Sequence, residues 1–70
     1  MAESVYTVIE LVGTSTESWE KAAMNAVNTA SKSLRDLRVA EIVKLDLKIE
    51  NGKVTAFRTR VNVSFKYEKD

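Results

Sequence analysis

The side chains of this sequence that could take part in chemistry are carboxylates, hydroxyls and basic groups, because histidine and cysteine are both absent. Their absence removes the usual general base, thiol nucleophiles, disulfides and the common zinc ligands. Three hydroxyls cluster at Thr14, Ser15 and Thr16 with no plausible base nearby, so we interpret them as helix-capping groups rather than nucleophiles. The carboxylates are scattered along the chain, as is typical of solvated surface charge. The sequence therefore argues against an enzyme.

Two arginines and one tryptophan are the best candidates for contacts with a ligand. Arg58 and Arg60 are two positions apart, so in a strand they share one face, where their guanidinium forks could hold a phosphate or carboxylate. Pairing with Asp46 or Glu41, across strands or between subunits, is the alternative interpretation. Trp19 stands near the start of a helical pattern, and we interpret it as a core or interface anchor rather than a ligand-stacking ring.

The composition is that of one small folded domain covering residues 1–70. The chain has 70 residues, a net charge of +1 and 44% hydrophobic residues, which disfavours nucleic acid and membrane as partners. The sequence shows neither an apolar run that could cross a membrane nor a signal pattern, so we expect cytoplasmic residence. A core this small is marginal, and with disulfides and zinc excluded we expect oligomerisation to stabilise it.

The first elements that would position these side chains are a strand and the start of a helix. The apolar and β-branched run over residues 5–12 predicts a buried strand that ends at Gly13. Ser15 is the predicted N-cap, with its hydroxyl accepting from a backbone N–H two or three residues further on. A capping box between Thr14 and Glu17 is the alternative.

A helix and a hairpin are predicted to follow. Apolar spacings of three and four predict a helix that ends at Asp36, a residue that tolerates a left-handed backbone. Its apolar positions are Trp19, Ala22, Ala23, Ala26, Val27, Ala30, Leu34 and Leu37. Strands over residues 39–50 and 53–67 are separated by Asn51-Gly52, which is typical of a type I′ hairpin turn.

A two-residue turn sets a register for this hairpin and therefore two faces. The predicted opposite pairs are Glu50 with Lys53, Asp46 with Phe57, Ile42 with Val61 and Ala40 with Val63. The face assigned to the helix carries Ala40, Ile42, Phe57, Val61, Val63 and Phe65. The second face carries Val39, Val43, Leu45, Leu47 and Ile49 together with Arg58, Arg60, Asn62 and Ser64. One helix cannot cover both faces, so the second face predicts an interface or a ligand groove.

The order strand, helix, strand, strand predicts an α+β fold. A right-handed crossover makes the first two strands parallel, and the third fits between them, antiparallel to both. The result is a β-α-β-β unit with a three-stranded sheet packed on one amphipathic helix.

The sequence resembles the dodecin family over nearly its whole length and without gaps. The segments that carry the resemblance are VYTVIELVGTS at residues 5–15, SWEKA at 18–22, NAV at 25–27, ASKSLR at 30–35, LR at 37–38, IENGKV at 49–54 and VNVSFKY at 61–67. The resemblance implies the same β-α-β-β fold. It also implies a hollow homododecamer of 23 symmetry that stores a small ligand, in the best-known members a flavin such as FMN or riboflavin.

The resemblance also implies positions for a flavin site. The family's stacking tryptophan matches Val39, and its ring-reading glutamine matches Leu45. Valine offers no π face and leucine no hydrogen bond, so flavin binding is predicted to be weakened or lost. With Arg58 and Arg60, these positions form the predicted ligand site.

The segment Arg38-Val39-Ala40 is similar to the dodecin branch without that tryptophan, which includes a calcium-binding member. Calcium takes about six to eight oxygen ligands, and Glu10 and Glu17 could contribute them across subunits. Lys44 stands where a further acid would help. Two function classes therefore stay open: a shell that sequesters a small ligand or an ion, and a structural or interaction shell whose ligand site has become aliphatic.

Overall fold

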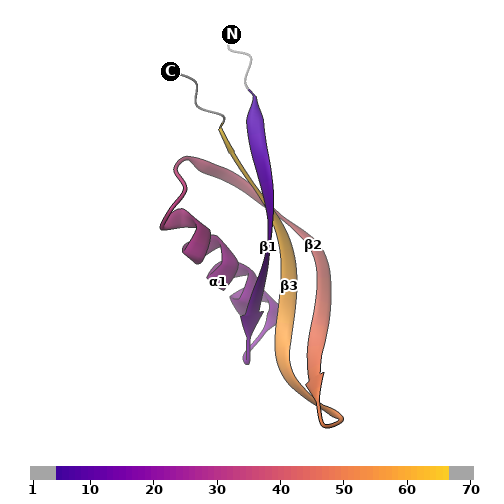
Figure 1. Cartoon of the computed structure of the whole chain (residues 1–70). Helices are drawn as coiled ribbons and strands as arrows, with labels where there is room; N and C mark the ends of the chain where they lie inside the picture. Colours follow the sequence, from indigo (N-terminus) through magenta and orange to yellow (C-terminus); the bar gives the residue numbers. More distant parts are fainter. Residues whose placement is uncertain (1–4, 67–70) are drawn as a thin grey trace.

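The computed structural model describes residues 5–66, which form a three-stranded sheet with one helix against it (Figure 1). The elements are β1 (Tyr6–Ser15), α1 (Trp19–Ser31), β2 (Leu37–Glu50) and β3 (Lys53–Lys66). The strand order is β1-β3-β2, and β3 pairs antiparallel with both neighbours. The predicted α+β fold with β-α-β-β order is confirmed. Tyr67, the predicted last residue of the final strand, lies outside the described residues.

The core lies between α1 and the β1 and β3 side of the sheet. Ala26 packs on Val61 and Val63, while Ala22 and Ala30 are also buried one turn to either side. These alanines let the helix lie close to the strands. Within the described residues, no helix is long and apolar enough to cross a membrane.

Gly13 is the point of closest approach between α1 and β1. The predicted strand ended at this glycine, but β1 continues through it to Ser15. A side chain at position 13 would overlap the Ala22 backbone carbonyl and lie 3.0 Å from the Ala26 Cβ. The glycine is therefore required by packing, and it does not end the strand.

The helix begins three residues later than predicted. Ser18 is the N-cap, and its hydroxyl accepts from the Lys21 backbone N–H at 3.0 Å. The Ser15 hydroxyl does accept from the Glu17 backbone N–H, at 2.9 Å, as expected. That bond forms a turn ahead of the helix because the chain must first leave the strand direction. The capping box at Thr14 is not the helix start.

The helix also ends earlier than the predicted Asp36. It ends at Ser31 with Lys32 as C-cap, and the Leu34 N–H donates to the Ala30 carbonyl at 2.9 Å. Asp36 does adopt the expected left-handed backbone, with φ of 57°, but it lies in the connection to β2. Leu37 is the first residue of β2 and packs against the core from there.

The hairpin turn follows the prediction, whereas the middle of its register does not. Asn51 and Gly52 have φ of 53° and 75°, and Glu50 lies opposite Lys53. The pairs Ile42–Val61 and Ala40–Val63 are also confirmed. Between these ends, register shifts follow Ile42 and Lys48, so Asp46 lies opposite Arg58 and not Phe57. Bulges of this kind move side chains to the other face of a sheet.

The shift divides the predicted second face. Leu45 lies opposite Thr59 and Leu47 opposite Phe57, on the face that carries α1. Arg58, Arg60, Asn62 and Ser64 lie on the other side, which we call the outer face. Val39, opposite Ser64, joins them there. The prediction of one surface that combines the aliphatic residues with the arginines was therefore wrong, because Leu45, Leu47 and Ile49 face the helix side.

Candidate functional site

The outer face carries the charged side chains that the sequence singled out. Arg58 donates to both oxygens of Asp46, from Nε at 2.8 Å and from a terminal nitrogen at 3.3 Å. Arg60 lies 3.4 Å from a Glu10 carboxylate oxygen. One arginine is thus bound to β2 and the other to β1, because β3 runs between those strands. The expected pairing of an arginine with Asp46 is present within one chain.

Asp46 is the group whose electrostatics this arrangement changes most clearly. The hydrogen bond from Arg58 lowers the pKa of the Asp46 carboxyl, with smaller contributions from the charges of Arg58, Arg60 and Lys44. The same bond raises the pKa of Arg58. Both side chains are partly open to solvent, so the pair is a surface fork rather than a buried one. It holds Arg58 in place and uses two of the five N–H donors of its guanidinium.

Arg60 is less completely satisfied than Arg58. Its Nε is buried and has no hydrogen-bond partner among the described residues, and its contact with Glu10 is long. Lys44 lies opposite Arg60 across the sheet, and Val12 lies opposite it on the other side. A cationic row therefore crosses the middle of the outer face.

The predicted flavin positions do not form one site within a chain. Val39 and the two arginines share the outer face, but Leu45 is on the helix side. Val39 lies opposite Ser64, six residues along β3 from Arg58, which is about 20 Å of strand. The valine is 61% exposed and has no aromatic side chain opposite it on β3. The residues present do not fit a flavin inside a single chain.

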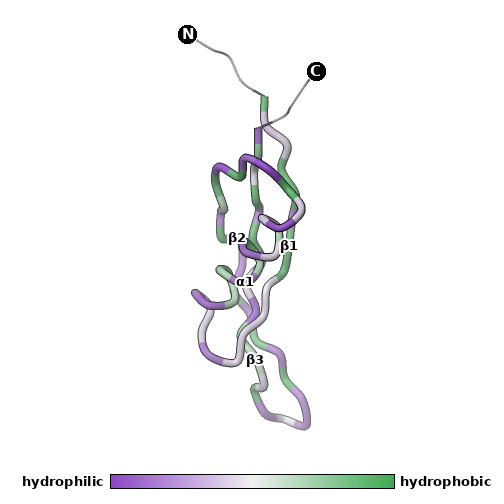
Figure 2. The backbone as a smooth tube through the Cα atoms, turned by 90° about the vertical axis from the view of Figure 1, so that its left-hand side faces the viewer, coloured by the Kyte–Doolittle hydropathy of each residue, from purple (hydrophilic) through white to green (hydrophobic). Residues whose placement is uncertain are grey.

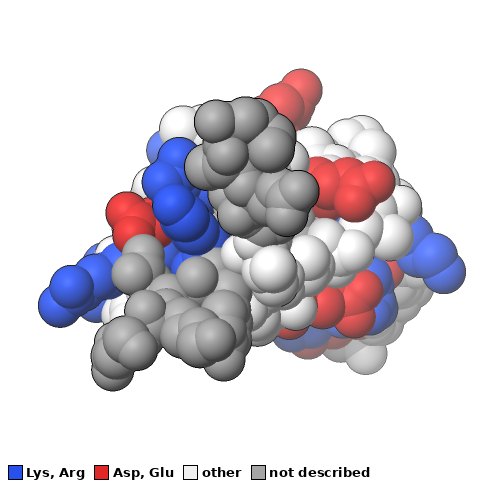
Figure 3. All heavy atoms as spheres, turned by 90° about the horizontal axis from the view of Figure 1, so that it is seen from above, with Lys and Arg blue, Asp and Glu red and all other residues white. Residues whose placement is uncertain are grey.

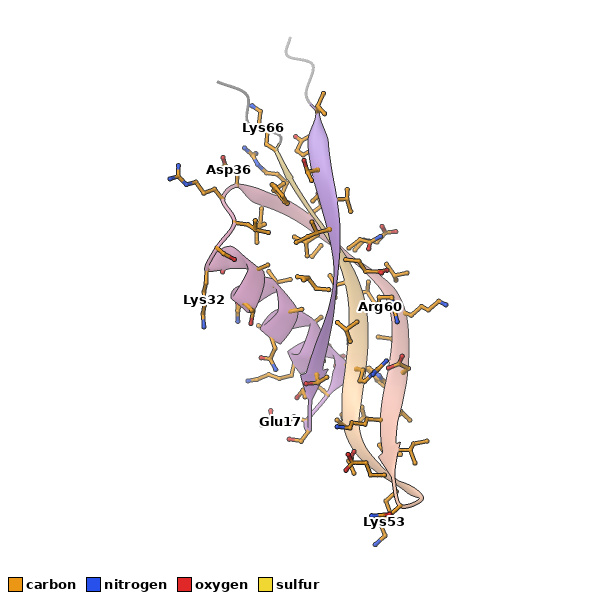
Figure 4. All side chains as sticks on the ribbon, viewed as in Figure 1. Glu17, Lys32, Asp36, Lys53, Arg60 and Lys66 are labelled. Carbon is orange, nitrogen blue, oxygen red and sulfur yellow. The ribbon has the colours of Figure 1, made fainter. Side chains whose placement is uncertain are left out.

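The predicted calcium ligands are also far apart. Glu10 is in the middle of β1 and pairs with Arg60, whereas Glu17 lies in the turn before α1. Figure 4 shows Glu17 at the lower end of α1 and Arg60 higher up, on the sheet. Among the described residues, no three carboxylates gather where they could hold a metal ion. Residues 5–66 of one chain therefore provide no carboxylate cluster of the kind that calcium needs.

Trp19 joins the helix to the hairpin, which agrees with its interpretation as an anchor. Its ring packs edge-on against Phe57 with centroids 5.1 Å apart. Its indole N–H donates to the Asp46 carbonyl at 3.1 Å, and its own carbonyl accepts from the buried Thr59 hydroxyl at 2.9 Å. Sequence reasoning missed Thr59, whose position in an apolar strand pattern was the available signal.

Two of the hollows that lie against the helix in the described part of the chain have no charged side chain in their lining. One, of about 630 Å³, lies between α1 and β1 and has Asn25, Thr29 and Ser33 among its polar lining residues. The other, of about 290 Å³, lies between α1 and β2, where Met24 and Ile42 are exposed. These hollows offer apolar contact but no acid, base or charged group.

Comparison with known proteins identifies the family. The dodecin family model matches residues 5–68. The chain belongs to the dodecin family. A calcium dodecin from Mycobacterium tuberculosis is 47% identical over 64 residues, covering 90% of this chain and 89% of the relative.

Solved dodecin structures agree with this fold. Dodecin from Streptomyces coelicolor superposes with a TM-score of 0.91 at 34% identity, covering 100% of both chains. The crystal structure of the calcium-chelating calcium dodecin from Mycobacterium tuberculosis, described as having a novel calcium-binding site, gives 0.83 at 43% identity and 96% coverage of each chain. The tt0972 protein from Thermus thermophilus gives 0.87 at 34% identity, covering 97% of this chain and 100% of that one.

Proposed function

We propose that this dodecin assembles into a homododecamer of 23 symmetry that holds a small ligand without turning it over. The observation that supports assembly is the exposure of β2. Every residue of that strand after Leu37 is exposed in the single chain, although the strand is rich in aliphatic side chains. The large ones are Val39, Ile42, Val43, Leu45, Leu47 and Ile49. An apolar surface of this kind on a small domain favours contact with other subunits.

Light scattering and native mass spectrometry at micromolar concentration test the assembly. We expect a species of many subunits and no folded monomer of 7.9 kDa. A stable, folded monomer as the main species would contradict the proposal. The same spectrum, recorded on protein as purified, reports the mass of any retained ligand.

Flavin is the ligand expected from the family, and we propose that this chain binds it weakly. Val39 supplies no aromatic wall, and Leu45 faces away from the arginines. By analogy with a nucleic-acid base stacked on an aromatic side chain, losing the stacking contact with the flavin ring costs about 1–3 kcal/mol of binding free energy. Each 1.4 kcal/mol is about a tenfold change in affinity. Titration of riboflavin and FMN, followed by flavin fluorescence, should show no nanomolar binding. Quenching at nanomolar protein concentration would overturn this part of the proposal.

Calcium is the second candidate ligand because a relative with 47% identity is a calcium dodecin. A site would have to form between subunits, with Glu10 and Glu17 contributed by different chains. Calorimetric titration of the assembled protein with Ca²⁺ tests this, with Glu10→Gln and Glu17→Gln expected to reduce binding. Glu20→Gln, an exposed acid in the first turn of α1, is the matched control.

A shell without any ligand is the alternative from a different class. In that case the purified assembly would carry no bound mass and would take up neither flavin nor Ca²⁺. Residence in the cytoplasm remains a prediction from the sequence.

A further inference from the structure

The outer face carries two neighbouring rows of side chains with opposite charge. The first row crosses the sheet as Glu10, Asn62 and Glu41, and is acidic at both ends. The second crosses as Val12, Arg60 and Lys44, and is basic. The rows are two residues apart on β3, which is about 7 Å. Figure 3, which looks down onto one end of the molecule, shows that acidic and basic side chains also lie close together there, among uncharged ones.

Within these two rows, the charged residues of β2, Glu41 and Lys44, have no oppositely charged partner among residues 5–66. Glu10 is held by Arg60, and Asp46 by Arg58. Among residues 5–66, neither Glu41 nor Lys44 forms an ion pair, and both are exposed. The face therefore presents one acid and one base on the same strand, each without an opposite charge in contact.

A second copy of this chain would supply the missing partners of both residues. Consider two outer faces packed on each other about a two-fold axis that lies in the interface and runs across the strands, between the two rows. This axis places the acidic row of each copy over the basic row of the other and keeps β2 over β2. Glu41 of one copy then faces Lys44 of the second, and the reverse pair forms by symmetry. Sheets pack about 10 Å apart, a gap that these two long side chains can bridge.

We propose that the outer faces of two copies form an isologous interface in which Glu41 of each copy pairs with Lys44 of the other. The exposed side chains of Val8, Val12 and Val39 on the same face would lose contact with water there. This inference rests on the proposed assembly and adds the surface and the residue pair that form it. It commits the face to a second copy of the chain rather than to a small anion.

Charge reversal tests the pair. Glu41→Lys places like charges opposite each other twice per interface, as does Lys44→Glu, and such contacts are strongly unfavourable. Each single variant should give smaller species than the wild type in sedimentation velocity, or need about tenfold more protein to assemble. Glu20→Lys and Lys32→Glu make the same charge changes on α1 and should assemble as the wild type does.

Mixing the two single variants is the decisive experiment. In a mixed pair, each reversed side chain meets an opposite charge on the partner, so the mixture should assemble although neither variant does so alone. The double variant Glu41→Lys/Lys44→Glu should also assemble. Refolding the two variants together keeps the test valid if either is poorly folded alone.

Two outcomes would overturn the interface. One is that both single variants assemble like the wild type, and the other is that the mixture behaves as the sum of its separate components. In either case a wild-type assembly would leave the proposed function intact. A monomeric wild type would instead refute the proposed function itself.

Discussion

At the scale of single residues, Asp46 connects the two faces of the sheet. Its carboxylate binds Arg58 on the outer face, while its backbone carbonyl accepts the Trp19 indole N–H from the helix side. Because the hydrogen bond from Arg58 lowers the pKa of Asp46 in the folded protein, the pair stabilises the folded state when the carboxyl is ionised. That contribution is present above the ordinary pKa of 3.8 and is lost as the pH falls through the lowered value.

The prediction at this scale concerns the pH dependence of stability. The variant Asp46→Asn should be less stable than the wild type at pH 7, and the difference should shrink as the pH falls below about 4. Urea unfolding at a series of pH values measures it. Arg58→Gln removes the other partner of the same ion pair. Its difference in stability from the wild type should also shrink as the pH falls. A difference that stays constant down to pH 2 would show that the pair does not contribute through ionisation.

At the scale of elements, the contact of α1 with β1 depends on Gly13. A methyl group at this position would overlap backbone atoms of Ala22, and a backbone cannot move aside as a flexible side chain can. We therefore expect Gly13→Ala to destabilise the fold by at least about 1–3 kcal/mol, the usual cost of overpacking. Thermal unfolding followed by circular dichroism measures the loss.

Gly52 provides a control with a different requirement. Its φ of 75° needs a residue that tolerates a left-handed backbone, and nothing lies within 4 Å of a Cβ added there. Gly52→Asn should therefore be mild, because asparagine accepts this conformation, whereas Gly13→Asn should be severe. Equal losses at the two positions would show that close approach is not the reason for Gly13.

The elements also show what the sequence could predict. The Asn51-Gly52 turn correctly predicted the strand pair next to it, Glu50 with Lys53, because the geometry of a two-residue turn is enough to set that pair. Apolar alternation alone did not reveal the bulge after Ile42, because the odd-numbered Val39 precedes it and only the helix-side positions of β2 change there from even to odd numbers. These helix-side positions are Ala40 and Ile42 before the bulge, and Leu45, Leu47 and Ile49 after it. Interpreting them as two separate apolar faces missed this change of phase.

The positions of the helix ends and the ligand site were less accessible from the sequence. The chain needs residues on both sides of α1 to reverse its direction, and apolar spacing does not report them, so Leu34 and Leu37 fitted the helical pattern without belonging to it. The predicted ligand residues Val39, Leu45, Glu10 and Glu17 were inferred from resemblance and from their chemistry. They are separated in one chain, and the contacts between subunits on which a shared site would depend are not encoded in a single sequence pattern.

At the scale of the whole molecule, the hairpin of β2 and β3 extends as an arm below α1, which lies against the middle of the sheet (Figure 1). The molecule measures 52 × 20 × 15 Å, an elongated shape that leaves much of its apolar surface uncovered. Figure 2 shows hydrophobic segments continuing into this arm. Ile42, Leu45, Leu47, Ile49 and Val54 form its exposed helix-side surface, which we call the apolar flank.

Replacing Leu47 distinguishes an assembled protein from an isolated chain. Leu47 is 41% exposed in one chain, so in a monomer Leu47→Ser would remove only the contacts of its buried part, and the loss of stability would not depend on protein concentration. If neighbouring subunits cover the apolar flank, the same change removes a contact from every copy and should cost about 1–3 kcal/mol per subunit.

Sedimentation velocity and thermal unfolding at two protein concentrations measure both effects, since dilution lowers the unfolding temperature only where assembly stabilises the fold. Lys32→Ser, at the C-cap of α1 and on neither the apolar flank nor the outer face, is the control and should behave as the wild type. If Leu47→Ser assembled and unfolded as the wild type does, the apolar flank would not be a subunit contact, and the outer face would have to carry the assembly alone.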